Sequence, residues 1–384
     1  MRIKYTNEVL KAIAEMQNAS NLNAKIGYQI MQRIYRRVAF PKPQELCTAA
    51  LSFQKEMREH GFQASIDEAM MGVALYQIIY SVVDEQNESL PMGVVFPIIQ
   101  NSKIFKERDC KELESNPFVK NIKMDGLEYG TKSTAKRIMK PSELFEYGSC
   151  LWRDNIYIPK LAMASEEMEF PCLMDAEGDC IDCVDPMTIL ESKRYIQNAR
   201  GNVLILGCNI GYFAYMFSNK ANVNSITIVE QDADTLDLFE SSILPQFENG
   251  NKITTICSDY KDYLNSIKDG EYDYCLVDLG QGMEAYSKYV EIKALHSCVD
   301  CKKMKMEYWH EDDYLRVIAA IVTEIVDLTC KMTMDEEFEY VDRHESYDKW
   351  IRICLWLLME KVEIKRPKDL EMLTNPERLK RVLG

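Results

Sequence analysis

The sequence of 384 residues contains no cluster of basic side chains and only four histidines. Its 46 Lys and Arg are outnumbered by 61 Asp and Glu, which gives a formal net charge of −15 at pH 7. Binding to the phosphate backbone of DNA or RNA depends on clustered Lys and Arg. The composition therefore disfavours a nucleic-acid partner and favours a small-molecule substrate such as a cationic or amine-bearing one.

Long hydrophobic runs are also missing. The most apolar stretch, "WIRICLWLLMEKV" from Trp350 to Val362, is too short to span a bilayer and carries Arg352 near its start. We expect a packed helix there and no membrane partner.

The first residues, "MRIKYTNEVLKAIAEM", lack the pattern of a secretory leader, and the chain holds 13 cysteines. Free thiols in such number indicate a reducing compartment, so we expect a cytoplasmic protein. Two Cys-x-x-Cys pairs occur, Cys180 with Cys183 and Cys298 with Cys301. Because structural zinc modules usually place their pairs about 12 to 20 residues apart, we expect reduced thiols here and no metal site.

The first 125 residues are expected to form a helical N-terminal domain. Ser65 and Glu68 have the spacing of a capping box, and apolar residues such as Met71 and Leu75 follow at helical spacing. A second helix is expected to carry Ile26, Ile30 and Ile34 along one face and to end at Arg36 and Arg37, closed by the prolines that follow. Neither helix carries a chemical motif.

Residues 126–185 have a different texture, with short β-rich runs and recurring Gly and Pro. They predict a small β-element with a turn at "AEGD", residues 176–179. The sequence then predicts a helix from Pro186 to Asn198, because proline is well tolerated at the first helical position.

After Arg200 strands and helices alternate. The runs "NVLILG", "SITIVE", "KITTIC" and "YDYCLVDL" are separated by segments of helical length that begin at Tyr212, Asp232 and Tyr260, and "KMKMEYW" is a further candidate strand. Such alternation predicts βαβ units, a parallel sheet and helices on both faces. We therefore expect an α/β, Rossmann-like domain over residues 186–384, with helices at its C-terminus.

The first strand of this domain runs into the turn "GCNIGY". Gly207 supplies the first glycine of a dinucleotide fingerprint, but Asn209 and Tyr212 stand where the second and third glycines would be, which disfavours NAD and FAD. A ligand with an adenosine and no pyrophosphate needs only a sharp turn, room at Gly211 and a helix N-terminus near a carboxylate. S-adenosylmethionine (SAM) meets this description.

Acidic residues at the ends of the next strands support this prediction. Glu230, followed by Gln231, ends the second strand, where a carboxylate can accept both ribose hydroxyls. Asp259 follows the third strand and can accept from the adenine amino group, while Tyr260 can offer its ring. Asp278 ends the fourth strand, and ligands of open α/β sheets lie at this edge.

The segments "VLILGCNIG", "ITIVEQDADTLDLF", "CSDYKDYL" and "YDYCLVDL" resemble the successive motifs of class I SAM-dependent methyltransferases, most closely the spermidine-synthase-like branch. The resemblance covers residues 186 to about 285 and implies a Rossmann-like fold with SAM on Gly207, Gly211, Glu230, Asp259 and Asp278. The sequence departs from the pattern at two positions. Ile205 replaces an acid found in many such methyltransferases, and Asn209, which tolerates a left-handed backbone, replaces the middle glycine.

The resemblance leaves the transferred group open. Asp278 is the best candidate to orient or deprotonate an amine, but an Asp at a strand end serves as often to cap the next turn. The segment "DLGQG" lacks the second acid that spermidine synthases place after this Asp, which ranks aminopropyl transfer below methyl transfer. Tyr308, Trp309 and His310 either line a substrate pocket or belong to the core or its rim, and the second alternative is favoured.

The leading hypothesis is a SAM-dependent methyltransferase that acts on a small or amine-bearing substrate, with the helical domain closing over the crevice or mediating a homodimer. The first alternative is an aminopropyl or aminocarboxypropyl transferase. The second is a non-catalytic interaction protein with the same fold. We expect Glu230 to lie near solvent, so that replacing it would weaken SAM binding and leave folding intact.

Overall fold

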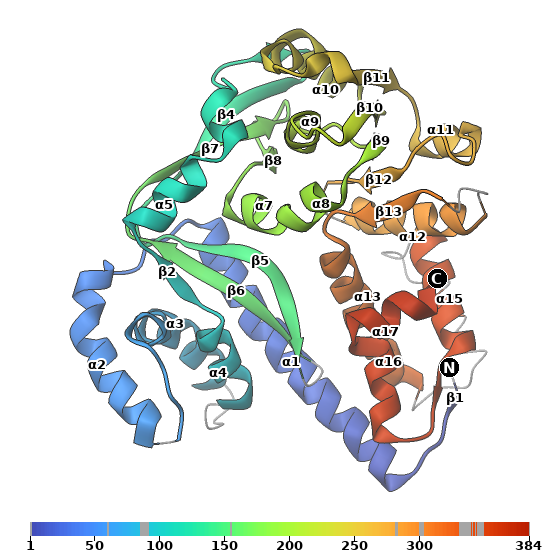
Figure 1. Ribbon diagram of the computed structural model, residues 1–384. Coiled ribbons are helices and arrows are strands. Elements are labelled where there is room, and N and C mark those ends of the chain that lie inside the picture. Colours follow the sequence, from blue (N-terminus) through green and yellow to red (C-terminus); the bar gives the residue numbers. More distant parts are fainter. Residues whose placement is uncertain are drawn as a thin grey trace.

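The computed structural model describes residues 2–59, 61–84, 92–153, 156–280, 283–298, 303–329, 339, 341, 343 and 349–383. Figure 1 shows a Rossmann-like half on one side of the molecule, a helical N-terminal group on the other and the long helix α1 passing along both. No helix among these residues has both the length and the apolar character needed to cross a bilayer.

The N-terminal segment is mainly helical, as the sequence predicts. Its elements are β1 (Arg2–Ile3), α1 (Asn7–Tyr35), α2 (Pro43–Glu59), α3 (Ile66–Asp84), α4 (Met92–Gln100), β2 (Lys103–Phe105), α5 (Glu107–Glu114) and α6 (Pro117–Asn121). The capping box before α3 is confirmed, since the Ser65 amide donates to Glu68 Oε2 at 2.5 Å and the Glu68 amide donates to Ser65 Oγ at 3.1 Å.

Helix α1 carries Ile26, Ile30 and Ile34 and ends before Arg36, as expected, but it begins far upstream of Ile26. It begins after Thr6, whose side chain accepts from the Val9 amide, and its buried residues continue at helical spacing through Ile13 to Ile30. The asparagine-rich stretch in its middle has low helix propensity, which hides the continuity in the sequence. Packing of the buried face compensates for that propensity.

Two small sheets form the β-element. Their remaining strands are β3 (Glu128–Tyr129), β4 (Lys132–Met139), β5 (Leu144–Arg153), β6 (Ile156–Ala164), β7 (Met168–Met174) and β8 (Cys180–Cys183), with orders β2-β6-β5 and β3-β4-β7-β8. The turn at residues 176–179 is confirmed: Asp175 Oδ1 accepts from the amides of Glu177 and Asp179 and closes the hairpin between β7 and β8.

The helix expected from Pro186 to Asn198 is split into α7 (Pro186–Glu191) and α8 (Lys193–Asn198). Asp185 caps α7 by accepting from the Thr188 amide. The break falls at the buried Ser192, whose hydroxyl donates to the Ile189 carbonyl and lies 3.0 Å from the hydroxyl of Tyr212. Competition of a serine hydroxyl for backbone acceptors explains the interruption.

The predicted parallel sheet is confirmed. Its strands have the order β11-β10-β9-β12-β13 and all pair in parallel. The strands are β9 (Gly201–Leu206), β10 (Val223–Glu230), β11 (Ile253–Cys257), β12 (Tyr274–Val277) and β13 (Lys305–Tyr308). The helices between and after them are α9 (Tyr212–Ser218), α10 (Ala233–Leu238), α11 (Tyr260–Ser266), α12 (Met283–Cys298) and α13 (Glu311–Thr329). The strands that follow β9 in the chain add first on one side of it (β10 and β11) and then on its other side (β12 and β13). Open α/β sheets bind ligands at such a switch point in the strand order.

Side chains of β9 alternate between two hydrophobic cores. Val203 and Ile205 belong to the core that includes α9 and α10, whereas Leu204 and Leu206 belong to the core that includes α11, α12 and α13. The second core also includes residues of the C-terminal elements α15 (Lys349–Lys361), η4 (Pro367–Leu370), α16 (Glu371–Thr374) and α17 (Pro376–Leu383). The two cores together cover both faces of the sheet. The strand β14 (Glu363–Ile364) pairs in parallel with β1.

The long helix α1 joins the two halves of the molecule. Val9, Ile13 and Met16 pack in the core of the Rossmann-like half, while Ile26 and Ile30 pack with α2, α3 and the β2-β6-β5 sheet. One continuous helix of the segment 1–125 therefore also contributes to the core of the Rossmann-like half. Figure 1 shows the N-terminal end of this blue helix beside the red C-terminal elements.

Candidate functional site

The turn between β9 and α9 contains three residues with positive φ: Gly207 at 103°, Asn209 at 47° and Gly211 at 79°. A Cβ at Gly207 would run into the backbone oxygen of Asp278, so glycine lets the ends of β9 and β12 approach closely. A Cβ at Gly211 would lie 2.5 Å from the ring of Phe239. Both glycines thus serve the packing of the turn, and Asn209 takes the left-handed conformation expected of it.

Glu230 holds this turn together. Its Oε2 accepts from the Cys208 amide at 2.8 Å, and its Oε1 accepts from the amides of Gln231 and Asp232 at 2.8 and 2.9 Å. The hydroxyl of Tyr260 lies 3.4 Å from the same Oε1. The expectation that this strand end lies near solvent is wrong, because Glu230 is only 6% exposed. A buried carboxylate that accepts several N–H groups fixes the backbone around it.

These hydrogen bonds limit what Glu230 can offer a nucleoside. A carboxylate has about four accepting positions, and the bonds at Oε1 use the capacity of that oxygen. Oε2 retains one position beside its bond to Cys208. Glu230 can therefore accept one ribose hydroxyl without releasing an amide. The predicted contact of Glu230 to both ribose hydroxyls requires one of its present hydrogen bonds to break. The side chain of the next residue, Gln231, is exposed.

Asp259 and Tyr260 begin α11, one strand away. Asp259 is the N-cap of this helix, and its Oδ1 accepts from the Lys261 amide at 2.8 Å. It is half-buried, and Oδ2 has no hydrogen bond to any other residue in the described part of the chain. The ring of Tyr260 is buried among residues of the hydrophobic core, so its hydroxyl, rather than its face, reaches the site.

Asp278 lies at the end of β12 beside a second carboxylate that the sequence analysis missed. Asp182, on the short strand β8, accepts from the Ile210 amide at 3.2 Å through Oδ2 and from the Cys183 amide at 2.9 Å through Oδ1. Asp278 accepts from the side chain of Asn209 and from the Gly280 amide. The void that both acids line holds about 10 Å³, about the space of one water.

Burial raises the pKa of Asp182, and the neighbouring charge of Asp278 raises it further. Burial also raises the pKa of Asp278, although His310 and the hydrogen bond from Asn209 oppose the change. Two adjoining carboxylates, here the buried Asp278 and the half-buried Asp182, repel each other when both are ionised. A cation placed between them would relieve that repulsion.

His310 approaches this pair from the start of α13. Its Nδ1 lies 3.4 Å from Asp313 Oδ2. Burial lowers the pKa of His310, but the hydrogen bond and charge of Asp313, with the charges of Asp278 and Asp182, outweigh burial and leave the pKa raised. Its backbone has a φ of 61°, which is uncommon for a residue other than glycine. Tyr308 and Trp309, just before it, are each 5% exposed and belong to the core, as expected.

A cavity of about 550 Å³ extends from His310 between α1, the strands β5 and β6, and α13. Tyr314 also lines it, and the Tyr314 hydroxyl donates at 2.9 Å to the carbonyl of Gly280, two residues beyond Asp278. The cavity therefore reaches the same strand end as the acidic pair. Its volume lies in the range of small-molecule sites.

The cysteine pair on β8 flanks Asp182. Cys180 is exposed, and Cys172 on β7 lies opposite Cys183 in the antiparallel pairing. The described residues contain no group of three or more His, Cys, Asp or Glu side chains placed to hold a metal ion. Cys298 and Cys301 lie outside the residues whose side chains the structure describes.

No known protein family matches the chain, and no curated protein does either. Solved structures with a similar arrangement include the precorrin 8w decarboxylase of Methanobacterium thermoautotrophicum, with 14% identity, 31% of this chain and 61% of that chain covered and a TM-score of 0.25. Spermidine synthase from Thermotoga maritima has 13% identity, coverage of 37% and 53% and a TM-score of 0.27. MNMC2 from Aquifex aeolicus has 10% identity, coverage of 81% and 98% and a TM-score of 0.28.

WbdD is another similar structure, with 18% identity, coverage of 30% of this chain and 25% of that chain and a TM-score of 0.21. The chain thus spans less than two thirds of the decarboxylase and about a quarter of WbdD. TM-scores this low do not bear on activity. The order and parallel pairing of the five strands, with helices on both faces, identify a Rossmann-like α/β fold.

Proposed function

We propose that the protein is a SAM-dependent transferase, and in the simplest case a methyltransferase acting on a small or amine-bearing acceptor. The observation that carries this proposal is the carboxylate pair of the half-buried Asp182 and the buried Asp278 at the carboxyl edge of the parallel sheet, beside the turn at Gly207. A cation relieves the repulsion of such a pair, and SAM carries both a sulfonium and an ammonium group.

The residues present fit this ligand chemically. Asp278 and Asp182 would hold its cationic part, the remaining position of Glu230 Oε2 would accept a ribose hydroxyl, and Asp259 Oδ2 would accept from the adenine amino group. The Ile210 amide is at present bonded to Asp182, and the void at the turn is about 10 Å³. We therefore infer that binding requires Asp182 and the turn to move apart.

Alkyl transfer depends mainly on alignment of the acceptor with the reacting carbon. SAM supplies that carbon on a positively charged sulfur. The acceptor atom forms the new bond with its lone pair, and the electrons of the broken carbon–sulfur bond stay on sulfur, which becomes neutral. Asp278 is the group we assign to orient an acceptor amine and take its proton, because its raised pKa suits a proton acceptor near neutral pH.

One observation favours the alternative of aminopropyl or aminocarboxypropyl transfer. The sequence after Asp278 lacks a second acid, but the fold supplies Asp182 from β8 next to Asp278. A pair of acids at this position suits an acceptor with more than one amine. The helical N-terminal segment gives no comparable support to the third alternative, a non-catalytic interaction protein.

Isothermal titration with SAM and with S-adenosylhomocysteine tests the proposal on the full chain. We expect saturable binding that is weakened in Asp278→Asn and unchanged in Asp262→Asn, which removes the same charge from the exposed face of α11. The absence of heat at high micromolar ligand would refute SAM binding. Turnover that releases S-adenosylhomocysteine identifies methyl transfer, and release of methylthioadenosine identifies the alternative.

A further inference from the structure

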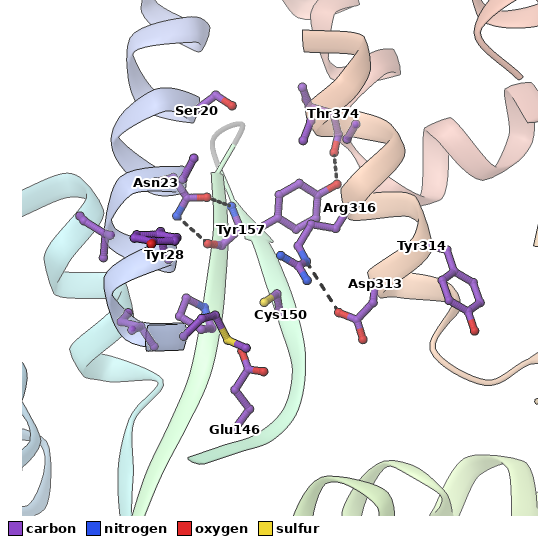
Figure 2. Close-up of a pocket in the computed structure, with 18 of the residues that line it drawn as sticks. Ser20, Asn23, Tyr28, Glu146, Cys150, Tyr157, Asp313, Tyr314, Arg316 and Thr374 are labelled. Atoms are coloured by element: carbon purple, nitrogen blue, oxygen red, sulfur yellow. Dashed lines mark hydrogen bonds and ion pairs between the residues drawn. The ribbon is translucent and has the colours of Figure 1, made fainter. Parts of the chain in front are cut away.

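The cavity of about 550 Å³ contains polar groups of opposite charge that the site so far does not use. Glu146 on β5 and Arg316 on α13 both line it, and Asp313 lies between Arg316 and His310. Figure 2 shows Arg316 extending from α13 toward Cys150 on β5, with Glu146 on that same strand. The cavity therefore offers a cationic and an anionic group to one ligand.

Arg316 has capacity for an anionic ligand group. Its Nε is buried and has no hydrogen-bond partner among the described residues, and its contact with Asp313 is an ion pair with 3.7 Å between Nε and Oδ1. The side chain is 42% exposed and lines the cavity. A guanidinium presents donors in a planar fork that matches a carboxylate. Asp313 holds the guanidinium in place without using that fork.

Glu146 supplies the opposite charge. No residue in the described ranges donates a hydrogen bond to its carboxylate. Burial raises its pKa to about 7, and the nearby charge of Asp313 adds to this while Arg316 opposes it. A half-buried carboxylate without a donor is costly when ionised, and an ammonium group beside it would remove that cost.

The remaining wall of the cavity is aromatic and polar. Tyr28 and Tyr286 line it together with Tyr157, whose hydroxyl donates to the carbonyl of Thr374 at 2.8 Å. Asn23 fixes the backbone of Tyr157 through two hydrogen bonds of 2.8 and 3.2 Å, so this part of the wall is pre-formed. Tyrosine rings accommodate the apolar body of a small ligand and leave recognition to the charged groups.

We propose that this cavity binds the acceptor as a zwitterion of the amino-acid class, with its carboxylate on Arg316, its α-ammonium group on Glu146 and a side-chain amine left to reach Asp278. This assignment rests on the proposed transferase function, because the cavity reaches His310 and Tyr314 beside the end of β12. A simple polyamine fits less well, since Arg316 would repel one of its ammonium groups.

The test compares amino acids with their decarboxylated amines as acceptors, using mass spectrometry of the products. We expect the full chain to modify one or more L-amino acids more efficiently than the corresponding amines. Arg316→Ala should raise KM for the amino acid by about tenfold or more, the loss expected for a charge-assisted hydrogen bond, and leave KM for the amine unchanged. Arg316→Lys should restore part of the loss, and Glu146→Gln should raise KM for both acceptors.

Arg108→Ala provides the matched control, because it removes the same charge from an exposed position on α5. Binding of S-adenosylhomocysteine, measured separately by titration, should be equal in the parent, Arg316→Ala and Arg108→Ala. Equal use of polyamines, insensitive to Arg316→Ala, or no turnover of any amino acid by a chain that binds SAM, would overturn the substrate class and leave the transferase function standing. Absence of SAM binding in the parent would instead overturn the transferase function itself.

Discussion

The Asp182 carboxylate accepts a hydrogen bond of 3.2 Å from the backbone N–H of Ile210, so the short strand β8 closes the turn that leads into α9. The same carboxylate lies beside Asp278, and the two acids come from segments about a quarter of the chain apart. These two contacts of Asp182 connect the β-element to the parallel sheet, and their effect on the free energy of unfolding can be measured.

Stability should depend on pH through this pair. The pKa of Asp182 is raised from 3.8 to about 7 in the folded protein. The folded state therefore retains a proton that the unfolded state releases, and stability falls as pH rises from about 4 to about 7. In Asp182→Asn this contribution is absent, so the loss of stability between about pH 5 and about pH 8 should be smaller.

Urea unfolding of the parent, Asp182→Asn and the exposed variant Asp262→Asn at both pH values measures the effect. The Asp262→Asn protein should behave like the parent. An identical pH dependence in all three would show that Asp182 ionises normally.

Replacing Glu230 should now affect folding as well as ligand binding. Glu230→Ala leaves the amides of Cys208, Gln231 and Asp232 without their acceptor, which should cost about 2 to 4 kcal/mol of unfolding free energy. Glu230→Gln should cost less, because its remaining oxygen can serve two of the amides while its NH₂ group opposes the third. Chemical denaturation, with SAM titration of the variants that remain folded, separates the two effects. Parent-like stability of Glu230→Ala would contradict this account.

Gly207→Ala should be strongly destabilising. The new Cβ would meet the backbone oxygen of Asp278, and the φ of 103° is unfavourable for alanine. Gly178→Ala serves as the control, because Gly178 also has a positive φ, 83°, but no atom lies within 4 Å of its would-be Cβ. We expect a cost of about 1 to 2 kcal/mol at Gly178 and about 1 to 3 kcal/mol more at Gly207. Urea midpoints of the two variants decide whether the close approach of β9 and β12 matters.

Cys180 should react with alkylating reagents faster than Cys47, which is also exposed. Hydrogen bonds from the Cys172 and Cys183 thiols lower the pKa of Cys180, and the charge of Arg137 lowers it further. Because the thiolate is the nucleophile, labelling by iodoacetamide at about pH 6, followed by mass spectrometry, should modify Cys180 first. Arg137→Gln should slow the labelling of Cys180 and leave that of Cys47 unchanged. Equal rates for both cysteines in the parent would contradict the prediction.

The sequence predicts the Rossmann-like half well because its signals are local. The strands β9, β10 and β12 contain apolar runs, and Asp232 and Asp259 cap the helices that follow β10 and β11. The length of α1 is missed, because tertiary packing overrides the low helix propensity of its middle. The split between α7 and α8 is missed for the converse reason, since a single serine hydroxyl interrupts an otherwise helical pattern.

The candidate site is predictable only in part. The turn residues and the strand-end acids are adjacent to recognisable strands, and the structure brings Gly207, Glu230 and Asp278 to one edge. The sequence carries no comparable signal for Asp182, which stands inside a Cys-x-x-Cys pair in a different sheet. Glu146 and Arg316 line the same cavity, and the walls of this cavity come from segments that are distant in the sequence. Such long-range contacts leave no periodic pattern in the sequence.

Helix α1 contributes buried residues to the sheet core and to the helical core, and Asn23 between these contacts is bonded to β6. A continuous helix transmits a tilt along its whole length, because its backbone hydrogen bonds resist bending. Any widening of the cavity on the side of α1 must therefore shift the packing at Val9 and at Ile30 together. Movement of this cavity wall is thus linked to contacts at both ends of the helix, about 30 Å apart at about 1.5 Å per residue.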